Sequence, residues 1–201
     1  MRKAVLLLVM VAAALPVIAG MTHASPDSTA HPYEGLLFEL RVIPQYEAAK
    51  SVAERGEIVL LGPGYAFSRV CVLSLLFATG SRVLEPSAAR PVSGRFGFGG
   101  ARLEITYSPA PESPIRPFCS AGAGLYSIIN SDGYGYNGNG FNAGAGVVWE
   151  PADSFRGRLG FEYDGMRFFN QVRPGGGAFD PFTLSAAGVS LSVSFVPGIV
   201  P

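Results

Sequence analysis

Seven charged residues stand at alternate positions in three segments of this chain. Because successive side chains of a strand point to opposite faces, the members of each segment would share one face. Facing carboxylates such as Glu162 and Asp164 could serve acid–base catalysis, and a row of ions could line a pathway. Paired with arginines, the same carboxylates would instead form a plug. The set is Glu39, Arg41, Arg102, Glu104, Arg158, Glu162 and Asp164.

Other parts of a catalytic site are missing from the sequence. The only two histidines are His23 and His31, near the N-terminus, so the predicted strands hold no histidine that could act as a base. Without a histidine cluster, the two cysteines predict no metal site. The sequence therefore predicts no enzyme, no cofactor and no metal, and it favours the ion-paired plug.

The elements that must position these charges have the two-residue period of strands. The pattern is clearest over residues 140–150 and 155–164, where one face is apolar and the other is glycine, polar or charged. A membrane barrel turns its apolar face to lipid and its polar face inward. The apolar positions are Phe141, Ala143, Ala145, Val147 and Trp149, then Leu159, Phe161 and Tyr163.

The same pattern predicts eight strands, which makes the chain an all-β, eight-stranded antiparallel up-and-down transmembrane barrel. Gly62-Pro63-Gly64 is predicted to be a tight turn. Long connections are expected at 44–55, 80–93, 130–139 and 169–181, and short ones near 62, 108 and 151. The predicted strands are 33–43, 56–61, 65–79, 94–107, 115–129, 140–150, 155–164 and 182–196.

The N-terminal segment predicts export. Arg2 and Lys3 precede an apolar run that is too short to span a bilayer and that ends in small residues. Residues 1–24 are therefore expected to be a signal peptide, cleaved after Ala19 or Ala24. Residues 25–32 would form a lead-in, residues 33–196 the barrel and residues 197–201 a tail.

Composition limits the partners. Charged residues make up 15% of the chain, well below the ~25% of an average soluble domain. The leader holds two of the 15 basic residues and no acidic one, so the mature chain has a net charge of about −2. This balance argues against nucleic acid as a partner.

Cys71 and Cys119 fall on strands separated by one other strand, which is too far for a disulfide, so free thiols are expected.

Three segments resemble the small outer-membrane barrels of the OmpA-like and OmpX-like type. They are 118–126 (FCSAGAGLY), 141–149 (FNAGAGVVW) and 159–163 (LGFEY). The resemblance covers about residues 33–196. It implies a monomer of the Gram-negative outer membrane, in contact with outer-membrane lipid and inserted by the assembly machinery. Such barrels usually end on an aromatic residue, whereas this chain continues past Phe195 to Pro201.

The segment 133–138 matches a dinucleotide-binding fingerprint by letter, but a strand follows it instead of the required helix. It is predicted to be a loop in which Tyr134, Tyr136 and Asn137 could contact a surface ligand.

The predicted function is a structural or surface-interaction role through long extracellular loops. Two alternatives remain open at this stage. One is a narrow channel for small solutes or ions. The other is a soluble periplasmic, lipocalin-like barrel that binds an apolar ligand.

Overall fold

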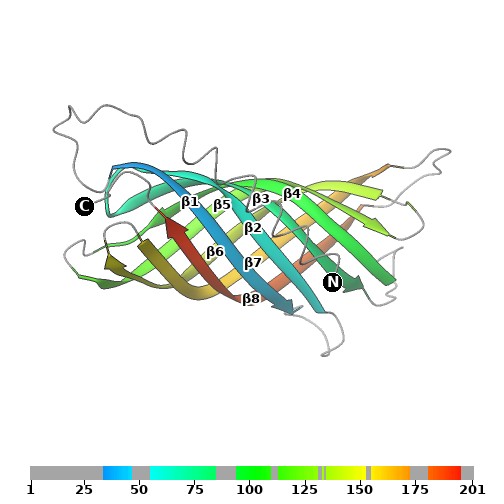
Figure 1. The fold of residues 1–201 in the computed structure, drawn as a ribbon. Helices are drawn as coiled ribbons and strands as arrows, with labels where there is room; N and C mark the ends of the chain where they lie inside the picture. The colour runs from blue at the N-terminus through cyan, green and yellow to red at the C-terminus, as the bar shows by residue number, and fades with distance from the viewer. Residues whose placement is uncertain are drawn as a thin grey trace, which may run out of the picture.

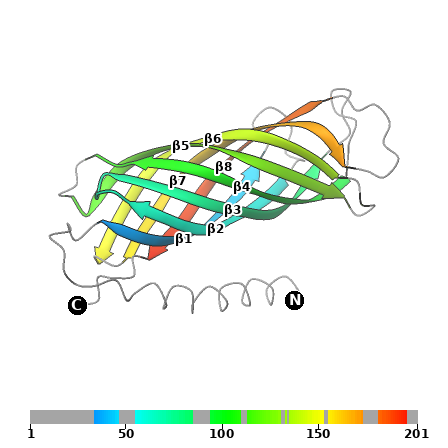
Figure 2. The ribbon, with the colours of Figure 1, turned by 90° about the horizontal axis from the view of Figure 1, so that it is seen from above.

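Eight antiparallel strands close into one barrel, in which each strand pairs with its sequence neighbours and β8 pairs with β1 (Figure 1). The computed structural model describes residues 34–46, 55–84, 94–109, 113–130, 133, 135–152, 155–172 and 181–195. The predicted signal peptide, lead-in and C-terminal tail lie outside these residues. Two perpendicular views show the strands crossing the barrel obliquely (Figures 1 and 2). The fold class predicted from the sequence is confirmed.

The strand bounds agree best with the prediction for the fourth, fifth and eighth strands, whereas the sixth begins five residues earlier and the seventh ends eight residues later than predicted. Within the described residues there is no helix long and apolar enough to cross a bilayer. The strands are β1 (Gly35–Tyr46), β2 (Arg55–Ala66), β3 (Cys71–Leu84), β4 (Gly94–Tyr107), β5 (Ile115–Asn130), β6 (Gly135–Ala152), β7 (Phe155–Val172) and β8 (Phe182–Phe195).

The predicted turn at Gly62-Pro63-Gly64 is wrong, because these residues continue β2. A Cβ at Gly62 would lie 1.9 Å from the carbonyl oxygen of Leu75, so close strand packing, rather than a turn, requires the glycine. The real connection is 67–70. There the Ser68 hydroxyl accepts hydrogen bonds from the backbone N–H groups of Val70 and Cys71, at 3.2 and 3.3 Å.

The predicted loop at 130–139 is also wrong over most of its length, since β6 already begins at Gly135. Only residues 131–134 connect β5 to β6. The strands β6 and β7 are 18 residues each, well beyond the about 9–11 residues that a tilted strand needs to cross a bilayer. A large part of the barrel wall therefore extends past any single membrane crossing.

We call the half that contains the start of β1 and the end of β8 the proximal half, and the opposite half the distal half. The outer surface of the proximal half is apolar: Phe161 is 72% exposed and Leu103 is 52% exposed. On β7 the outward apolar positions run from Phe155 to Tyr163, a span that matches one bilayer crossing. Other exposed members are Leu36, Val42, Tyr65, Leu75, Phe77, Ile105, Tyr107, Ile115, Leu125, Phe141, Val147, Leu159, Val189, Leu191 and Val193.

The distal half has the opposite polarity, with an apolar core inside the barrel. The rings of Phe168 and Phe182 stack at 5.2 Å between centroids, and Tyr136 meets Phe182 edge-on at 5.6 Å. Facing outward at this level are exposed polar residues such as Glu57, Arg95, Asn139, Arg167 and Thr183. The core consists of Ile43, Ile58, Leu60, Leu76, Ala78, Leu84, Phe96, Phe98, Tyr126, Ile128, Tyr136, Met166, Phe168, Phe182 and Leu184.

Both faces of the wall change polarity at about the same level of a strand. On β7, Asp164 is the last inward charge before the apolar Met166, and the outward side changes between Tyr163 and Arg167. The alternation in the sequence predicts polar-in, apolar-out packing along the whole barrel. The structure corrects this: that pattern holds in the proximal half, whereas the distal half is mostly apolar inside and carries more polar residues outside. Ile129 and Phe169 are exposed exceptions on the outside, and the buried Arg82 is an exception on the inside.

The two cysteines lie on β3 and β5, and both pair in register with Tyr107 of β4. Two interstrand spacings therefore separate them, and both thiols are free.

Candidate functional site

The seven charged residues singled out in the sequence meet inside the proximal half, on β1, β4 and β7. Arg41 is the centre of this lumen cluster. Its guanidinium contacts Glu39 and Glu162 at 2.5 Å each and Glu104 at 2.8 Å. Its side chain is 1% exposed. One arginine thus bridges carboxylates from three strands, which ties opposite walls of the barrel together.

Arg102 and Arg158 complete the lumen cluster. Arg102 reaches Glu162 at 2.8 Å, Glu104 at 2.9 Å and Asp164 at 3.2 Å. Arg158 lies 3.3 Å from Glu39 and 3.5 Å from Glu104, and it stacks 4.2 Å above the ring of Phe118. The cluster holds three arginines against four carboxylates, and every carboxylate contacts at least one arginine.

Neutral polar side chains occupy further sites on the carboxylates. The amide of Asn142 donates to Glu104 at 2.8 Å, and the hydroxyl of Ser74 donates to Glu39 at 3.3 Å. Gln45 donates to Asp164, and Thr106 accepts from Arg158 at 3.2 Å. Buried carboxylates retain their charge at tolerable cost only when they are paired and hydrogen-bonded in this way.

Small residues on β5, β6 and β8 make room for these long side chains. A Cβ at Gly122 would lie 2.6 Å from the side-chain oxygen of Asn142, and one at Gly144 would lie 3.1 Å from the Cγ atom of Glu162. Ser190 and Ser192 face inward and are buried. The glycine-rich strand pair in the sequence therefore has a packing reason.

We expect Gly122→Ala to lower the free energy of unfolding by about 1–3 kcal/mol, because the new methyl group would lie 2.4 Å from the carbonyl oxygen of Leu103 and 2.6 Å from the side chain of Asn142. Gly97→Ala is the matched control on β4, where a Cβ would meet nothing closer than 3.6 Å. It should change stability by less than about 0.5 kcal/mol. Urea unfolding in lipid vesicles, followed by the emission of the single tryptophan, Trp149, measures both. Equal effects would contradict the packing argument.

A second ionic group, which the sequence analysis did not single out, lies at the proximal end of the lumen. Arg116 binds the carboxylate of Glu150 with two nitrogens, at 2.6 and 2.8 Å. Arg156 adds a hydrogen bond at 2.6 Å and Arg69 an ion pair at 3.4 Å. The sequence pattern could have revealed Arg116 and Arg156, because each lies an even number of residues from inward-facing residues on its own strand.

Between the two ionic groups, the described residues leave little space for solutes or chemistry. A cavity of about 10 Å³ lies between the two ionic groups, lined in part by Thr106, Arg156 and Arg158, and this is room for about one water molecule. Among the described residues no group of three or more histidine, cysteine or acidic side chains could hold a metal ion. Beyond the lumen cluster, the inside of the distal half holds the apolar core and the buried Arg82, which donates a hydrogen bond to the carbonyl oxygen of Ser185 at 3.1 Å.

The predicted loop-contact residues do not form one exposed group. Tyr136 lies in β6 and points inward, 6% exposed, so its assignment to a loop is corrected. Asn137 is also in β6, and its side-chain oxygen accepts a hydrogen bond from Ser127 at 2.6 Å. Tyr134 lies outside the described residues. The alternation of inward and outward positions simply continues into this segment.

Comparison with solved structures supports the architecture. Neisserial surface protein A aligns with a TM-score of 0.51 and 14% identity, over 84% of this chain and 99% of that one. The chain has the fold of the small eight-stranded outer-membrane barrels. The N-terminal barrel of Pseudomonas aeruginosa OprF aligns at 0.46 and 16% identity, over 81% and 99%. No protein-family model and no curated protein matches the sequence.

Proposed function

We propose that the protein is a monomeric, non-enzymatic barrel of the outer membrane that projects its distal half beyond the lipid as a surface for contacts outside the cell. In this proposal residues 1–24 direct export, and the outer-membrane assembly machinery inserts the barrel. The distal half would then stand in water, and the last residues of β1, β3, β5 and β7 would lie at its far end.

The coincident change of polarity on the two faces of the wall carries this proposal. A lipid-facing surface must be apolar, and a surface in water should be polar over an apolar core. Phe161 and Arg167 both point outward on β7, six residues apart, and they satisfy these two opposite requirements. A soluble ligand-binding barrel rarely exposes a contiguous apolar surface as large as the apolar band of the proximal half.

The filled lumen favours a structural or interaction role over a channel. An ion would have to pass the lumen cluster, in which every carboxylate contacts an arginine, and then the stacked rings around Phe182. We propose that the cluster is a structural plug that stiffens the barrel where it crosses the membrane.

The channel alternative has a direct test. The refolded full-length protein should insert into planar bilayers without producing stable conductance steps, because both halves of the lumen are blocked. A porin added to the same bilayers is the positive control. The sample must also shift on a gel when heated, which shows that the barrel is folded. Reproducible conductance steps from such a sample would overturn the plugged-barrel proposal.

A further inference from the structure

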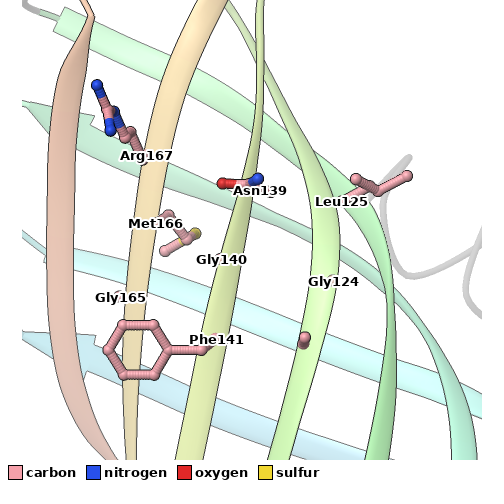
Figure 3. A pocket seen from close by; sticks show the side chains of 9 residues that line it. Gly124, Leu125, Asn139, Gly140, Phe141, Gly165, Met166 and Arg167 are labelled. Carbon is pink, nitrogen blue, oxygen red and sulfur yellow. The ribbon is translucent and has the colours of Figure 1, made fainter.

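An open groove of about 600 Å³ lies on the outside of the barrel over β5, β6 and β7 (Figure 3). It lies at the level where the outer surface changes from apolar to polar. Leu125 and Phe141 belong to its apolar side, and Asn139 and Arg167 to its polar side. In register, Asn139 pairs with both Leu125 and Arg167, so the polar and apolar parts are adjacent.

Glycine gives the groove its shape. Gly165 pairs with Phe141, and a Cβ there would come 2.8 Å from the Phe141 ring. Figure 3 shows that ring extending from β6 toward Gly165 on β7. Because Gly165 has no side chain, the ring can lie against β7, and both residues line the groove.

The groove carries a positive charge that no described residue neutralises. Arg167 is exposed and makes no ion pair or hydrogen bond with the part of the chain that the structure describes. The acidic residues nearest to it on β7, Glu162 and Asp164, point into the lumen and bind Arg41 and Arg102. Among the residues that the structure describes, no carboxylate lines the groove and competes with an anion for Arg167.

Amide side chains extend the polar side of the groove. Asn139 is exposed beside Arg167, and Asn170 is exposed opposite Asn137 in the next outward row. An amide offers both a donor and an acceptor, which suits the hydroxyl groups of a sugar. Arginine suits a phosphate, because its planar donors match two oxygens of the anion.

We propose that this groove binds a phosphorylated glycolipid of the outer leaflet. The phosphate would contact Arg167, the sugar hydroxyls would contact Asn139 and Asn170, and an acyl chain would lie along Phe141 and Leu125. The inference rests on the proposed function, because the groove borders lipid only when the proximal half is embedded. It adds a lipid class and a site to that function.

Lipid retention tests the proposal. The full-length protein is refolded in phosphatidylcholine vesicles that contain a minor fraction of either lipid A or phosphatidylglycerol, and it is then extracted for native mass spectrometry. We expect one retained lipid A per barrel. Arg167→Gln should reduce its retention about tenfold, the effect of losing one charge-assisted hydrogen bond. Asn139→Ala should reduce retention of lipid A and leave that of phosphatidylglycerol unchanged.

Arg95→Gln is the matched control, since Arg95 is an exposed outward arginine on β4, outside the groove. An equal loss in this variant would mean general charge attraction and would overturn the site. Retention of phosphatidylglycerol as strong as that of lipid A would overturn the sugar recognition. The heat-induced gel shift distinguishes failure of the lipid site from failure of the proposed function. A sample that inserts and shifts but retains no lipid refutes the lipid site alone. A sample that never inserts refutes the proposed function.

Discussion

Replacing Arg41 with methionine should lower the free energy of unfolding by about 3–5 kcal/mol, because Arg102 and Arg158 would remain as two positive charges against four buried carboxylates. Arg41 contacts Glu39, Glu104 and Glu162, and none of these carboxylates can reach water from its buried position. Methionine fills similar space, so the loss would come from charge rather than from a cavity. Urea titration in vesicles with Trp149 emission gives the value.

Two further variants make this test specific. Arg95→Met removes an exposed arginine that has no ion pair with the described residues, and it should change stability by less than about 0.5 kcal/mol. Adding Glu162→Gln to Arg41→Met should cost less than the sum of the two single changes, because it lowers the excess of negative charge that the loss of Arg41 leaves in the lumen cluster. If Arg41→Met were no more harmful than Arg95→Met, the lumen cluster would not hold the barrel together.

The second large effect concerns the outer surface. Leu159→Arg should cost about 2–4 kcal/mol, because position 159 lies in the middle of the apolar band on β7, where a charge would face the bilayer midplane. Phe169→Arg is the same kind of change on the same strand, at a nearly equal exposed fraction: 47% for Leu159 and 49% for Phe169. Because Phe169 lies in the distal half, its replacement should cost no more than about 1 kcal/mol.

The same vesicle titration compares the two variants, and the contrast between them is the result. In detergent micelles the difference should shrink, since a micelle adapts to a charge more easily than a bilayer does. Equal penalties in vesicles would mean that lipid covers both positions, or neither.

The sequence predicted the second half of the barrel well because its strands alternate cleanly. Small residues at 143–146 and charges at 158, 162 and 164 leave one apolar face on each strand, so the sequence shows which face is turned to the lumen. The lumen cluster follows from this alternation, since residues two apart on a strand must share a face. Which arginine meets which carboxylate depends on register between strands far apart in sequence, and no local pattern carries that information.

The first half was harder for a physical reason. Gly62-Pro63-Gly64 has the composition of a turn, yet the two glycines face the lumen, where neighbouring backbone leaves no room for a Cβ, and Pro63 faces outward. The true turn contains neither glycine nor proline and depends on the hydroxyl of Ser68. Placing the turn too early also started β3 six residues before Cys71.

The change of polarity along the barrel was missed for a related reason. Residues 72–78 are apolar at most positions on both faces, so alternation cannot show which side is buried. A strand that passes from lipid into water needs apolar residues outside in one part and inside in the other. Near Leu76 and Phe77 the two parts meet, so both faces are apolar and the two-residue period disappears. The distal apolar core becomes visible only when all eight strands are assembled.

Site-directed spin labels on β7 test the central claim most directly. With Cys71 and Cys119 replaced by serine, single cysteines at positions 161 and 169 would carry the label in lipid vesicles. We expect the label at position 161 to be accessible to oxygen and shielded from a water-soluble nickel chelate, and the label at position 169 to show the reverse. Labels that report the same surroundings at both positions would contradict a barrel that crosses the membrane with one half and stands in water with the other.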